Sequence, residues 1–265
     1  MEIIKLLATN AAISTLLFLG LWRISVMIRD PSFIDGWWPL GMVVMAITTF
    51  FLSGPADPHR IALTLLCTIW GVRLGLYLLW RWRQHGADRR YTNMMHHAQT
   101  VRGWSFAKAS LLLVFALQMP LQFVVCLPVQ LGQVTTIGPL GLLGWSGVVL
   151  AAIGIFFETV GDAQLVRFKA NPANQGKVLD TGLWRYTRHP NYFGDAATWW
   201  GLYLIAAETG WIGAASIPAP ILLTILLTKW SGVPTTEGTL RKRKPDYESY
   251  IARTSGFIPL PPRRT

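Results

Sequence analysis

The residues best suited to chemistry lie in the segment Gly182–Asp195, GLWRYTRHPNYFGD. It is polar, cationic and aromatic, yet it lies between two stretches apolar enough to cross a membrane. Ionisable groups at such a position are costly unless paired or solvated, so they mark a functional site by default. Pro190 allows a turn just before Asn191, which can open the next helix, and a helix N-terminus beside Arg185 and Arg188 suits an anion. The segment therefore predicts a cytoplasm-facing pocket for a cofactor that carries phosphate or carboxylate.

The residues that follow continue this pattern. His189 precedes the proline and can either donate to a phosphate or simply fill a turn. Asn191, Asp195 and Trp199 recur at i, i+4 and i+8, so they share one face of the following helix. An Asn/Asp pair followed by tryptophan exceeds what packing needs, and we expect this face to line a ligand.

Arg73 lies inside an apolar segment, in the stretch WGVRLGLY. An arginine left in hydrocarbon costs about 2.5–3.5 kcal/mol, so it needs a partner or water. Trp70, Arg73 and Tyr77 share a helix face through their i, i+3, i+7 spacing. An ion pair with another helix explains Arg73 as well as a site role does, and the two are compatible. The candidate partners are Asp35, Glu158 and Asp162.

Glu158 and Asp162 are four residues apart at the end of another apolar segment, so both carboxylates face the same way. Two acids this close can share a proton, or can hold the ribose or amide of a cofactor. The alternative is a solvated helix end that pairs with Arg167. Acids at a helix C-terminus oppose the macrodipole, however, and this mismatch favours a functional role.

Asp35, in the stretch SFIDGWW, precedes a further apolar segment. The simpler interpretation is a helix cap, since aspartate is common in caps. The catalytic interpretation is a carboxyl that stays protonated in an apolar pocket and donates to a substrate carbonyl. The sequence favours the cap.

Two further motifs are weaker. The run Asp88-Arg-Arg-Tyr91 suits a phosphate because the guanidinium fork matches phosphate oxygens, although basic loops are routine beside membranes. Nearer the C-terminus, Glu237 precedes a basic run, and Tyr247 and Tyr250 fall at i, i+3 on a short interfacial helix. This region either anchors the chain at the membrane surface or forms a lid over the site.

The composition fixes the class of protein that must position these residues. Hydrophobic residues make up 52% of the chain and charged residues 14%, which predicts a single all-α polytopic membrane domain over residues 1–265. About seven segments are long enough to span, although the second and sixth are short. The predicted spans are Ile3–Ser25, Trp37–Leu52, Ile61–Trp80, Ala109–Leu127, Leu140–Glu158, Tyr192–Ala207 and Trp211–Trp230.

The charge distribution predicts an orientation. With the N-terminus outside and the C-terminus cytoplasmic, nearly all basic residues fall on the inner side, as the positive-inside rule expects. The net charge of +11 then reflects topology and contact with anionic lipids, and nucleic-acid binding is not expected because the basic loops are short. Cys67 and Cys126 lie inside spans without metal-ligand spacing, and we expect no metal site. We expect the cytoplasmic membrane of a bacterium, or an endoplasmic-reticulum-type membrane in a eukaryote. The oligomeric state does not follow.

From about Asp35 to Pro262 the chain resembles the steroid 5α-reductase-like family of membrane proteins, and more closely its bacterial branch catalogued as a domain of unknown function. The resemblance is carried by WGVRLGLY at 70–77, DRRY at 88–91, TRHPNYFGD at 187–195 and the tail tyrosines. It implies a seven-helix bundle that holds NADPH in a cytoplasm-open cavity and admits a hydrophobic substrate from the bilayer. The implied reaction reduces a carbon–carbon double bond conjugated to a ketone.

The resemblance also implies roles for individual residues. By motif position, Asn191, Asp195 and Trp199 would line the nicotinamide or its ribose, and Asp162 with Glu158 would hold another polar part of the cofactor. The other residues implied at the cofactor are Arg73 in the chamber, Arg83, Lys169 and Lys177 at the phosphates, and Tyr186, Arg188, His189, Glu237 and Tyr247.

Four positions depart from the reductases. Trp70 stands where they have a tyrosine, and Asp35 is a shorter counterpart of the glutamate that pairs with that tyrosine. Glu158 replaces an asparagine, and Glu237 replaces a histidine. These departures leave the cofactor expectation in place and weaken the argument for a steroid substrate.

Three functions are compatible with the sequence. The leading one is an NADPH-dependent enone reductase in which Asp35 and the Trp70 N–H stabilise the enolate oxygen, while water or Tyr77 returns a proton. The second is an S-adenosylmethionine-dependent methyltransferase resembling isoprenylcysteine carboxyl methyltransferases, which share the element found here at Arg188–Gly194. The third is a lipid-binding or transport protein without chemistry. The reductase is favoured by Asn191, Asp195 and the stretch 88–91.

Overall fold

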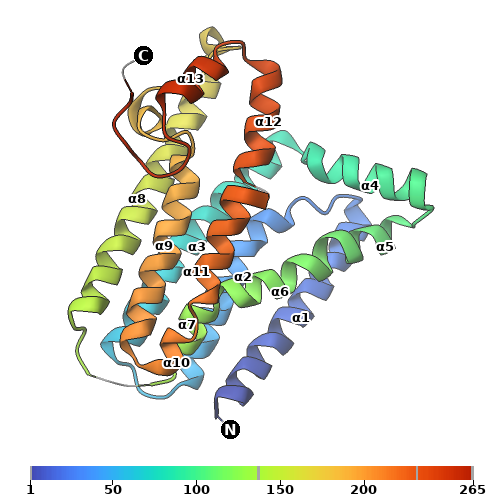
Figure 1. The fold of residues 1–265 in the computed structure, drawn as a ribbon. Helices are drawn as coiled ribbons and strands as arrows, with labels where there is room; N and C mark the ends of the chain where they lie inside the picture. Colours follow the sequence, from blue (N-terminus) through green and yellow to red (C-terminus); the bar gives the residue numbers. More distant parts are fainter. Residues whose placement is uncertain (1, 136–137, 231, 264–265) are drawn as a thin grey trace.

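A computed structural model describes residues 2–135, 138–230 and 232–263. The regular structure of these residues is helical throughout, and the long helices run between two ends of one bundle, with the N-terminus at one end and the C-terminal region at the other (Figure 1). The prediction of an all-α membrane protein is confirmed, because six helices are long and apolar enough to cross a membrane. They are Ile3–Ile28, Ile34–Leu52, Pro58–His85, Phe106–Val125, Leu142–Ala170 and Trp211–Arg243.

The predicted count of seven spans is not supported. The predicted sixth span, Tyr192–Ala207, is the helix α9 (Pro190–Glu208), but α9 is not among the six apolar helices. Much of it is covered by its neighbours, including the polar residues Asp195 and Thr198. A helix covered in this way needs no continuous apolar surface toward lipid. Its sequence can therefore be less apolar than the sequences of the other six helices.

The remaining elements follow in chain order. The first half contains α1 (Glu2–Ile28), α2 (Ile34–Leu52), α3 (Pro58–His85), α4 (Arg89–Arg102), α5 (Phe106–Ser110), a π-helical turn (Leu111–Phe115), α6 (Ala116–Val125) and α7 (Leu127–Leu131). The second half contains α8 (Leu142–Ala170), α9, α10 (Trp211–Ala214), α11 (Pro218–Ile225), a π-helical turn (Leu226–Trp230), α12 (Val233–Arg243) and α13 (Tyr247–Arg253). Short 3₁₀ turns lie at Pro172–Asn174 and Gly182–Arg185.

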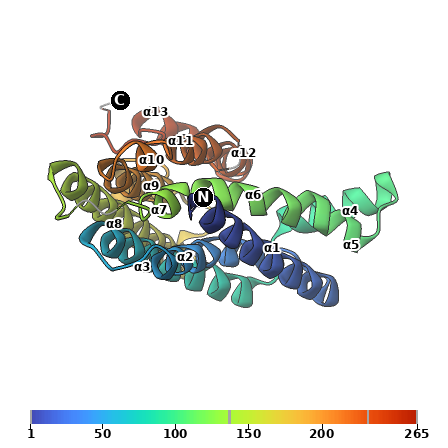
Figure 2. The same cartoon turned by 90° about the horizontal axis from the view of Figure 1, so that it is seen from below.

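Local sequence explains where α3 and α4 begin and end. Asp57 accepts hydrogen bonds from the first backbone N–H groups of α3, and Pro58 occupies the first turn, where its missing N–H is not needed. Asp88 caps α4 in the same way, and Gly103 ends α4 at a φ of 64°. Seen from below, α4 and α5 extend to one side of the bundle, while α8 lies on the other side (Figure 2).

Glycines allow α8 and α9 to pack with their backbones close together. Gly147 on α8 faces Gly201 on α9, and Gly154 on α8 faces Gly194 on α9. On each helix the two glycines are seven residues apart in sequence. A Cβ atom added at Gly154 would lie 2.4 Å from the backbone nitrogen of Thr198 and 2.5 Å from the carbonyl oxygen of Gly194. Small residues at helix contacts are typical of membrane bundles. This close pairing brings the carboxylates of α8 beside the first turns of α9.

Polar side chains from α6 and from the turn after α7 hold α2 in place. The Gln122 amide donates to the Trp38 carbonyl at 2.7 Å, and the Gln133 amide donates to the Ala46 carbonyl at 3.3 Å. Both amides are buried, so their donors need these acceptors. Since α2 begins with the residues around Asp35, these bonds set the position of that carboxylate.

Candidate functional site

The centre of the candidate site is an arginine held between two carboxylates. Arg73 Nη2 on α3 lies 2.6 Å from Glu158 Oε2, and Arg73 Nη1 lies 2.7 Å from Asp162 Oδ2, both on α8. The Asn191 amide on α9 donates to Asp162 Oδ1 at 3.2 Å. The expected interhelical ion pair of Arg73 is therefore present, with Glu158 and Asp162 as partners; Asp35 pairs elsewhere.

The i, i+4 spacing on α8 makes this arrangement possible. It places both carboxylates on one face, and the side chains of Glu158 and Asp162 are only 3% and 8% exposed. Buried carboxylates require a cation or several donors, and one guanidinium reaches both acids from α3. Three helices thus meet at a polar centre inside an apolar bundle.

Two tryptophans and an aspartate extend the polar centre. The rings of Trp70 and Trp199 meet edge to face with their centroids 5.2 Å apart, and both side chains are fully buried. Among the described residues, the two indole N–H groups and Asp195 Oδ1 are buried and make no hydrogen bond of full length and angle, although the Trp70 N–H faces the Asp195 carboxylate. Unpartnered buried polar atoms are rare, and they are suitable partners for the polar part of a ligand.

Two cavities border this centre. One of about 310 Å³ is lined by Arg73, Tyr77 and Asp162 among others, and a larger one of about 460 Å³ is lined by Asp35, Tyr77 and Lys169 among others. Ligand sites commonly have volumes of about 300–1,000 Å³. Tyr77 lies in the walls of both cavities, whereas Trp70 lines neither. The predicted pair of Asp35 and Trp70 is therefore not brought to one cavity.

Several basic residues line the larger cavity, and the sequence analysis placed only one of them, Lys169, at the cofactor. Its lining includes Lys169, as expected, and also Arg81, His85 and Arg89. Within the described residues, none of these four forms an ion pair with a carboxylate at salt-bridge distance. Helical spacing could have identified Arg81, because Arg73, Tyr77 and Arg81 follow i, i+4, i+8 along α3.

Of the residues expected at the cofactor, only Arg73, Asp162 and Lys169 line a cavity, and three others lie away from the polar centre as well as from both cavities. Arg83 is exposed, two residues beyond Arg81 and so on another face of α3. Lys177 is exposed, and its carbonyl accepts from Lys244 Nζ. Tyr186 is 43% exposed, and its carbonyl accepts from the backbone N–H of Leu260.

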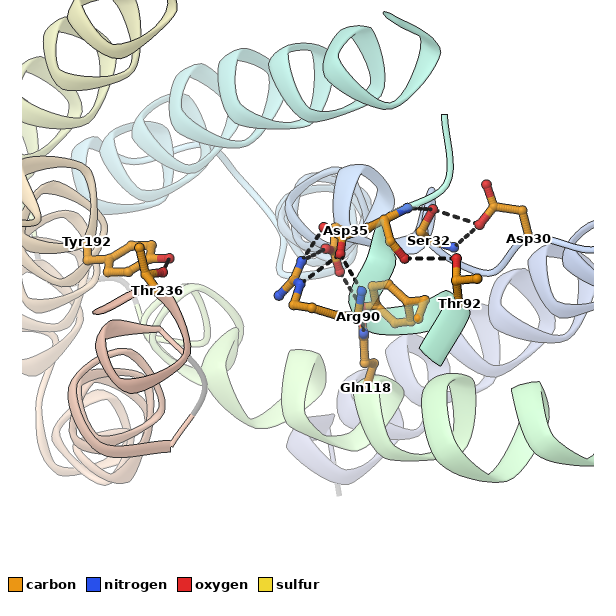
Figure 3. A network of polar contacts seen from close by, with 10 residues as sticks. Asp30, Ser32, Asp35, Arg90, Thr92, Gln118, Tyr192 and Thr236 are labelled. Atoms are coloured by element: carbon orange, nitrogen blue, oxygen red, sulfur yellow. Dashed lines mark hydrogen bonds and ion pairs between the residues drawn. The ribbon is translucent and has the colours of Figure 1, made fainter. Parts of the chain in front are cut away.

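Asp35 belongs to a network that joins α2 to α4 (Figure 3). The N-cap of α2 is Phe33, and no side chain caps this helix, so the expectation that Asp35 is a helix cap is wrong. Asp35 lies in the first turn, where Oδ1 accepts from the Tyr91 hydroxyl at 2.5 Å and Oδ2 accepts from Arg90 Nη2 at 3.0 Å. The DRRY motif therefore contacts a carboxylate through its last two residues.

The groups of α4 keep their ordinary charge states in this network. Burial, followed by the charge of Asp35, raises the pKa of Tyr91 well above its usual value, so the phenol stays protonated. Burial lowers the pKa of Arg90, but the contacts with Asp88 and Asp35 outweigh it, and the guanidinium stays charged. Burial also raises the pKa of Asp88, yet its hydrogen bonds from Arg90 hold that pKa below the ordinary value.

Arg188 and His189 contact the C-terminal region. Arg188 Nε donates to Glu237 Oε1 at 2.8 Å, and His189 Nε2 lies 3.1 Å from the same oxygen. Arg188 Nη1 also donates to the carbonyl of Thr254 at 2.6 Å. Tyr247 is buried, and burial followed by the charge of Glu237 raises its pKa to about 12. In this structure Arg188 and His189, which were expected beside an anionic ligand, hold the tail in place.

Glu237→Gln is expected to loosen this tail. The substitution keeps the volume but removes the charge that faces Arg188 and His189, and hydrogen bonds to charged groups contribute about 1.5–3 kcal/mol. Amide hydrogen exchange over residues 247–260 should become faster, while exchange in α2 and α3 stays unchanged. Glu248→Gln is the matched control, because Glu248 is 67% exposed and pairs only at the surface with Arg241. Equal protection in both variants would show that Glu237 does not hold the tail.

Comparisons with known proteins place the chain in a family. A family described as a protein of unknown function (DUF1295) matches residues 21–254. The probable O-methyltransferase ustE of Ustilaginoidea virens is 39% identical over 72 residues, which are 27% of this chain and 25% of that protein. A protein of Schizosaccharomyces pombe described as uncharacterised is 21% identical over 271 residues, covering 90% of this chain and 75% of the relative. No solved structure matches. Both relatives are fungal, so they give no support to a bacterial location.

Proposed function

The chain belongs to the DUF1295 family, and from this membership and the geometry of the site we propose that it is an NADPH-dependent membrane reductase. Its substrate is a lipid-soluble molecule with a carbon–carbon double bond conjugated to a ketone. The likeness of its motifs to the steroid 5α-reductase-like family supports the reaction class. The observation that carries the proposal is the buried cluster of Arg73, Glu158, Asp162 and Asn191 beside two cavities that share Tyr77.

The donor set suits a phosphorylated dinucleotide. Arg81, Arg89 and Lys169 line the larger cavity and match the charge of phosphate groups. NADPH held by these groups would supply the hydride to the β-carbon of the enone.

The chain's own residues would handle the proton and the developing charge. The Tyr77 hydroxyl, at the wall of both cavities, can give a proton to the α-carbon. The Trp70 N–H is fully buried and lines neither cavity, so we assign it no contact with the substrate oxygen. The two carboxylates fix the Arg73 guanidinium, which keeps a positive charge beside the reacting groups. Asp35 has no part as an acid here, because it already accepts two hydrogen bonds.

We also propose that the bundle crosses the membrane seven times, with the N-terminus outside. In Figure 1, α9 runs beside α8 between the same two ends as the apolar helices, so it can cross as a covered helix. The basic loops then lie on the cytoplasmic side, as the positive-inside rule expects. The cavity with Arg81 and Lys169 would open on that side.

A methyltransferase is the second candidate. The 39% identity to the probable O-methyltransferase of Ustilaginoidea virens favours it, although the match covers a quarter of that protein. S-adenosylmethionine carries a sulfonium cation, and Arg81, Arg89 and Lys169 give the larger cavity three cations against the two carboxylates of Asp35 and Asp88. The charge of the cavity therefore favours the reductase over the methyltransferase.

Cofactor binding to the detergent-purified protein separates the two candidates. A ligand at 100 times its dissociation constant stabilises a protein by about 2.7 kcal/mol, so thermal unfolding with NADPH, NADH and S-adenosylmethionine in parallel is a sufficient test. We expect a rise in Tm with NADPH, followed by oxidation of NADPH when a lipid enone is added. A rise with S-adenosylmethionine alone would contradict the reductase and establish the methyltransferase.

Arg81→Ala and Arg83→Ala form a matched pair for this assay. Both remove an arginine near the end of α3, but only Arg81 lines the cavity. We expect Arg81→Ala to weaken NADPH binding by about tenfold or more, since hydrogen bonds to charged groups contribute about 1.5–3 kcal/mol. Arg83→Ala should bind NADPH as the wild type does. Equal effects of the two substitutions would mean that the larger cavity does not hold the cofactor.

A further inference from the structure

Asp35 presents a carboxylate to the larger cavity, and the contacts around it define its charge state. The Gln118 amide donates to the Tyr91 hydroxyl oxygen at 2.8 Å, so the single proton of Tyr91 is free to point to Asp35 Oδ1, 2.5 Å away. Arg90 carries only donors and points one of them at Asp35 Oδ2. Both oxygens of Asp35 therefore face donors, which is the environment of an ionised carboxylate and not of a carboxyl that gives away a proton.

The network also fixes where this carboxylate points. Tyr91 is only 7% exposed and is packed in the apolar cluster between α1, α4 and α5. Asp88, which caps α4, accepts from Arg90, and its backbone N–H donates at 3.2 Å to the hydroxyl of Ser32, which lies just before α2. The start of α4 is thus connected to the start of α2 through Asp35 itself and through Ser32, three residues before it.

Acceptor capacity remains on the cavity side. An ionised carboxylate has about four acceptor positions, and the protein fills two of them. The Asp35 side chain is 26% exposed, and the residue lines the cavity. The other charged lining groups are mostly cations, which disfavours a ligand ammonium group beside them and suits a neutral hydroxyl instead.

We infer that Asp35 binds a hydroxyl group of the cavity's ligand, and that Tyr91 is the positioning residue that orients its carboxylate. The inference rests on the proposed function only in that the larger cavity is a ligand site. The hydroxyl can belong to a ribose of the cofactor or to the lipid substrate, and the chemistry at Asp35 is the same in both cases.

Pairs of probes that differ only in hydroxyl groups distinguish the two sources. The soluble pair is ADP and 2′,3′-dideoxy-ADP, and the lipid pair is testosterone and androst-4-en-3-one, which lacks the 17-hydroxyl. Binding is measured by isothermal titration to the full chain in detergent, for the wild type, Asp35→Asn, Tyr91→Phe and the double variant. Thr92→Val is the matched control on α4, because within the described residues its hydroxyl donates to the Asp88 carbonyl and not to Asp35. Thermal unfolding of each variant checks that it is folded.

In one of the two pairs, we expect the wild type to prefer the hydroxylated probe by about tenfold or more. Asp35→Asn should remove most of this preference, and Tyr91→Phe should reduce it several-fold without changing affinity for the deoxy probe. The double variant should lose no more than Asp35→Asn alone, because Tyr91 acts through Asp35. The pair that responds identifies the source of the hydroxyl.

Two results would overturn the inference: no preference for either hydroxylated probe in the wild type, or a preference that survives Asp35→Asn. These measurements do not depend on turnover. If no lipid enone oxidises NADPH while the preference depends on Asp35, the proposed reductase fails and the hydroxyl site stands. If NADPH is oxidised and the preference for the hydroxylated probe does not depend on Asp35, the proposed reductase stands and the hydroxyl site at Asp35 fails.

Discussion

Replacing Arg73 with methionine is expected to lower the free energy of unfolding by about 3–5 kcal/mol, because it leaves Glu158 and Asp162 buried without their cation. The two carboxylates are almost fully covered, and the side chain of Arg73 is itself only 20% exposed. Methionine fills a similar volume in the bundle, so the expected loss of stability comes from the two uncompensated carboxylates and not from poorer packing. Equilibrium unfolding in mixed detergent micelles measures the change.

A triple variant is the control for this prediction. In Arg73→Met/Glu158→Gln/Asp162→Asn the acids become neutral amides that need no cation, so most of the lost stability should return. NADPH binding should remain lost in both proteins if the cluster serves the cofactor. A single variant as stable as the wild type would show that water or other groups satisfy the two carboxylates.

Gly154→Ala is expected to destabilise the bundle by about 3 kcal/mol, at the upper end of the range for overpacking. The added Cβ would lie 2.4 Å from one backbone atom of α9 and 2.5 Å from another, and backbone cannot rotate away as a flexible side chain can. Separation of α8 from α9 would also move Asp162 away from Asn191, so NADPH affinity should fall with stability.

Gly20→Ala is the matched substitution. Gly20 lies inside α1, and a Cβ atom there meets nothing within 4 Å. Alanine is the better helix former by about 1 kcal/mol, so this variant should be as stable as the wild type or slightly more stable. If both alanine variants unfold alike, close packing of α8 on α9 is not what holds the two helices together.

The sequence identified the centre of the site because its physical reason is local. An arginine inside an apolar helix needs a partner, and two acids at i, i+4 on another helix are such partners. The structure joins these residues, with Asn191 beside them. The helical class followed equally directly from composition. Composition did not predict that α9 differs from the six apolar helices. The reason is that the hydropathy of a segment does not indicate whether other helices will enclose it.

The partners of Asp35 and Arg188 could not be derived in the same way. Aspartate near the start of a helix is an ordinary cap, and the contact with Tyr91 depends on where α4 folds back, 56 residues later. Arg188 had the spacing of an anion site, but Glu237 reaches it from 49 residues away. Arg81 was different: its spacing from Tyr77 on α3 is visible in the sequence, but it was not considered, because the resemblance pointed to Arg83.

The contacts of the tail have a consequence for the order in which the protein matures during synthesis. The segment that opens α9 is secured by residues translated much later: Arg188 bonds to Thr254 and Thr187 bonds to Phe257, 66 and 70 positions further along the chain. A ribosome that has inserted α8 and α9 into the membrane has therefore not yet supplied what secures Arg188. Thr187 and Arg188 can make these contacts only when translation has passed Phe257. A chain that stops short of that point would insert its helices and remain without a finished site.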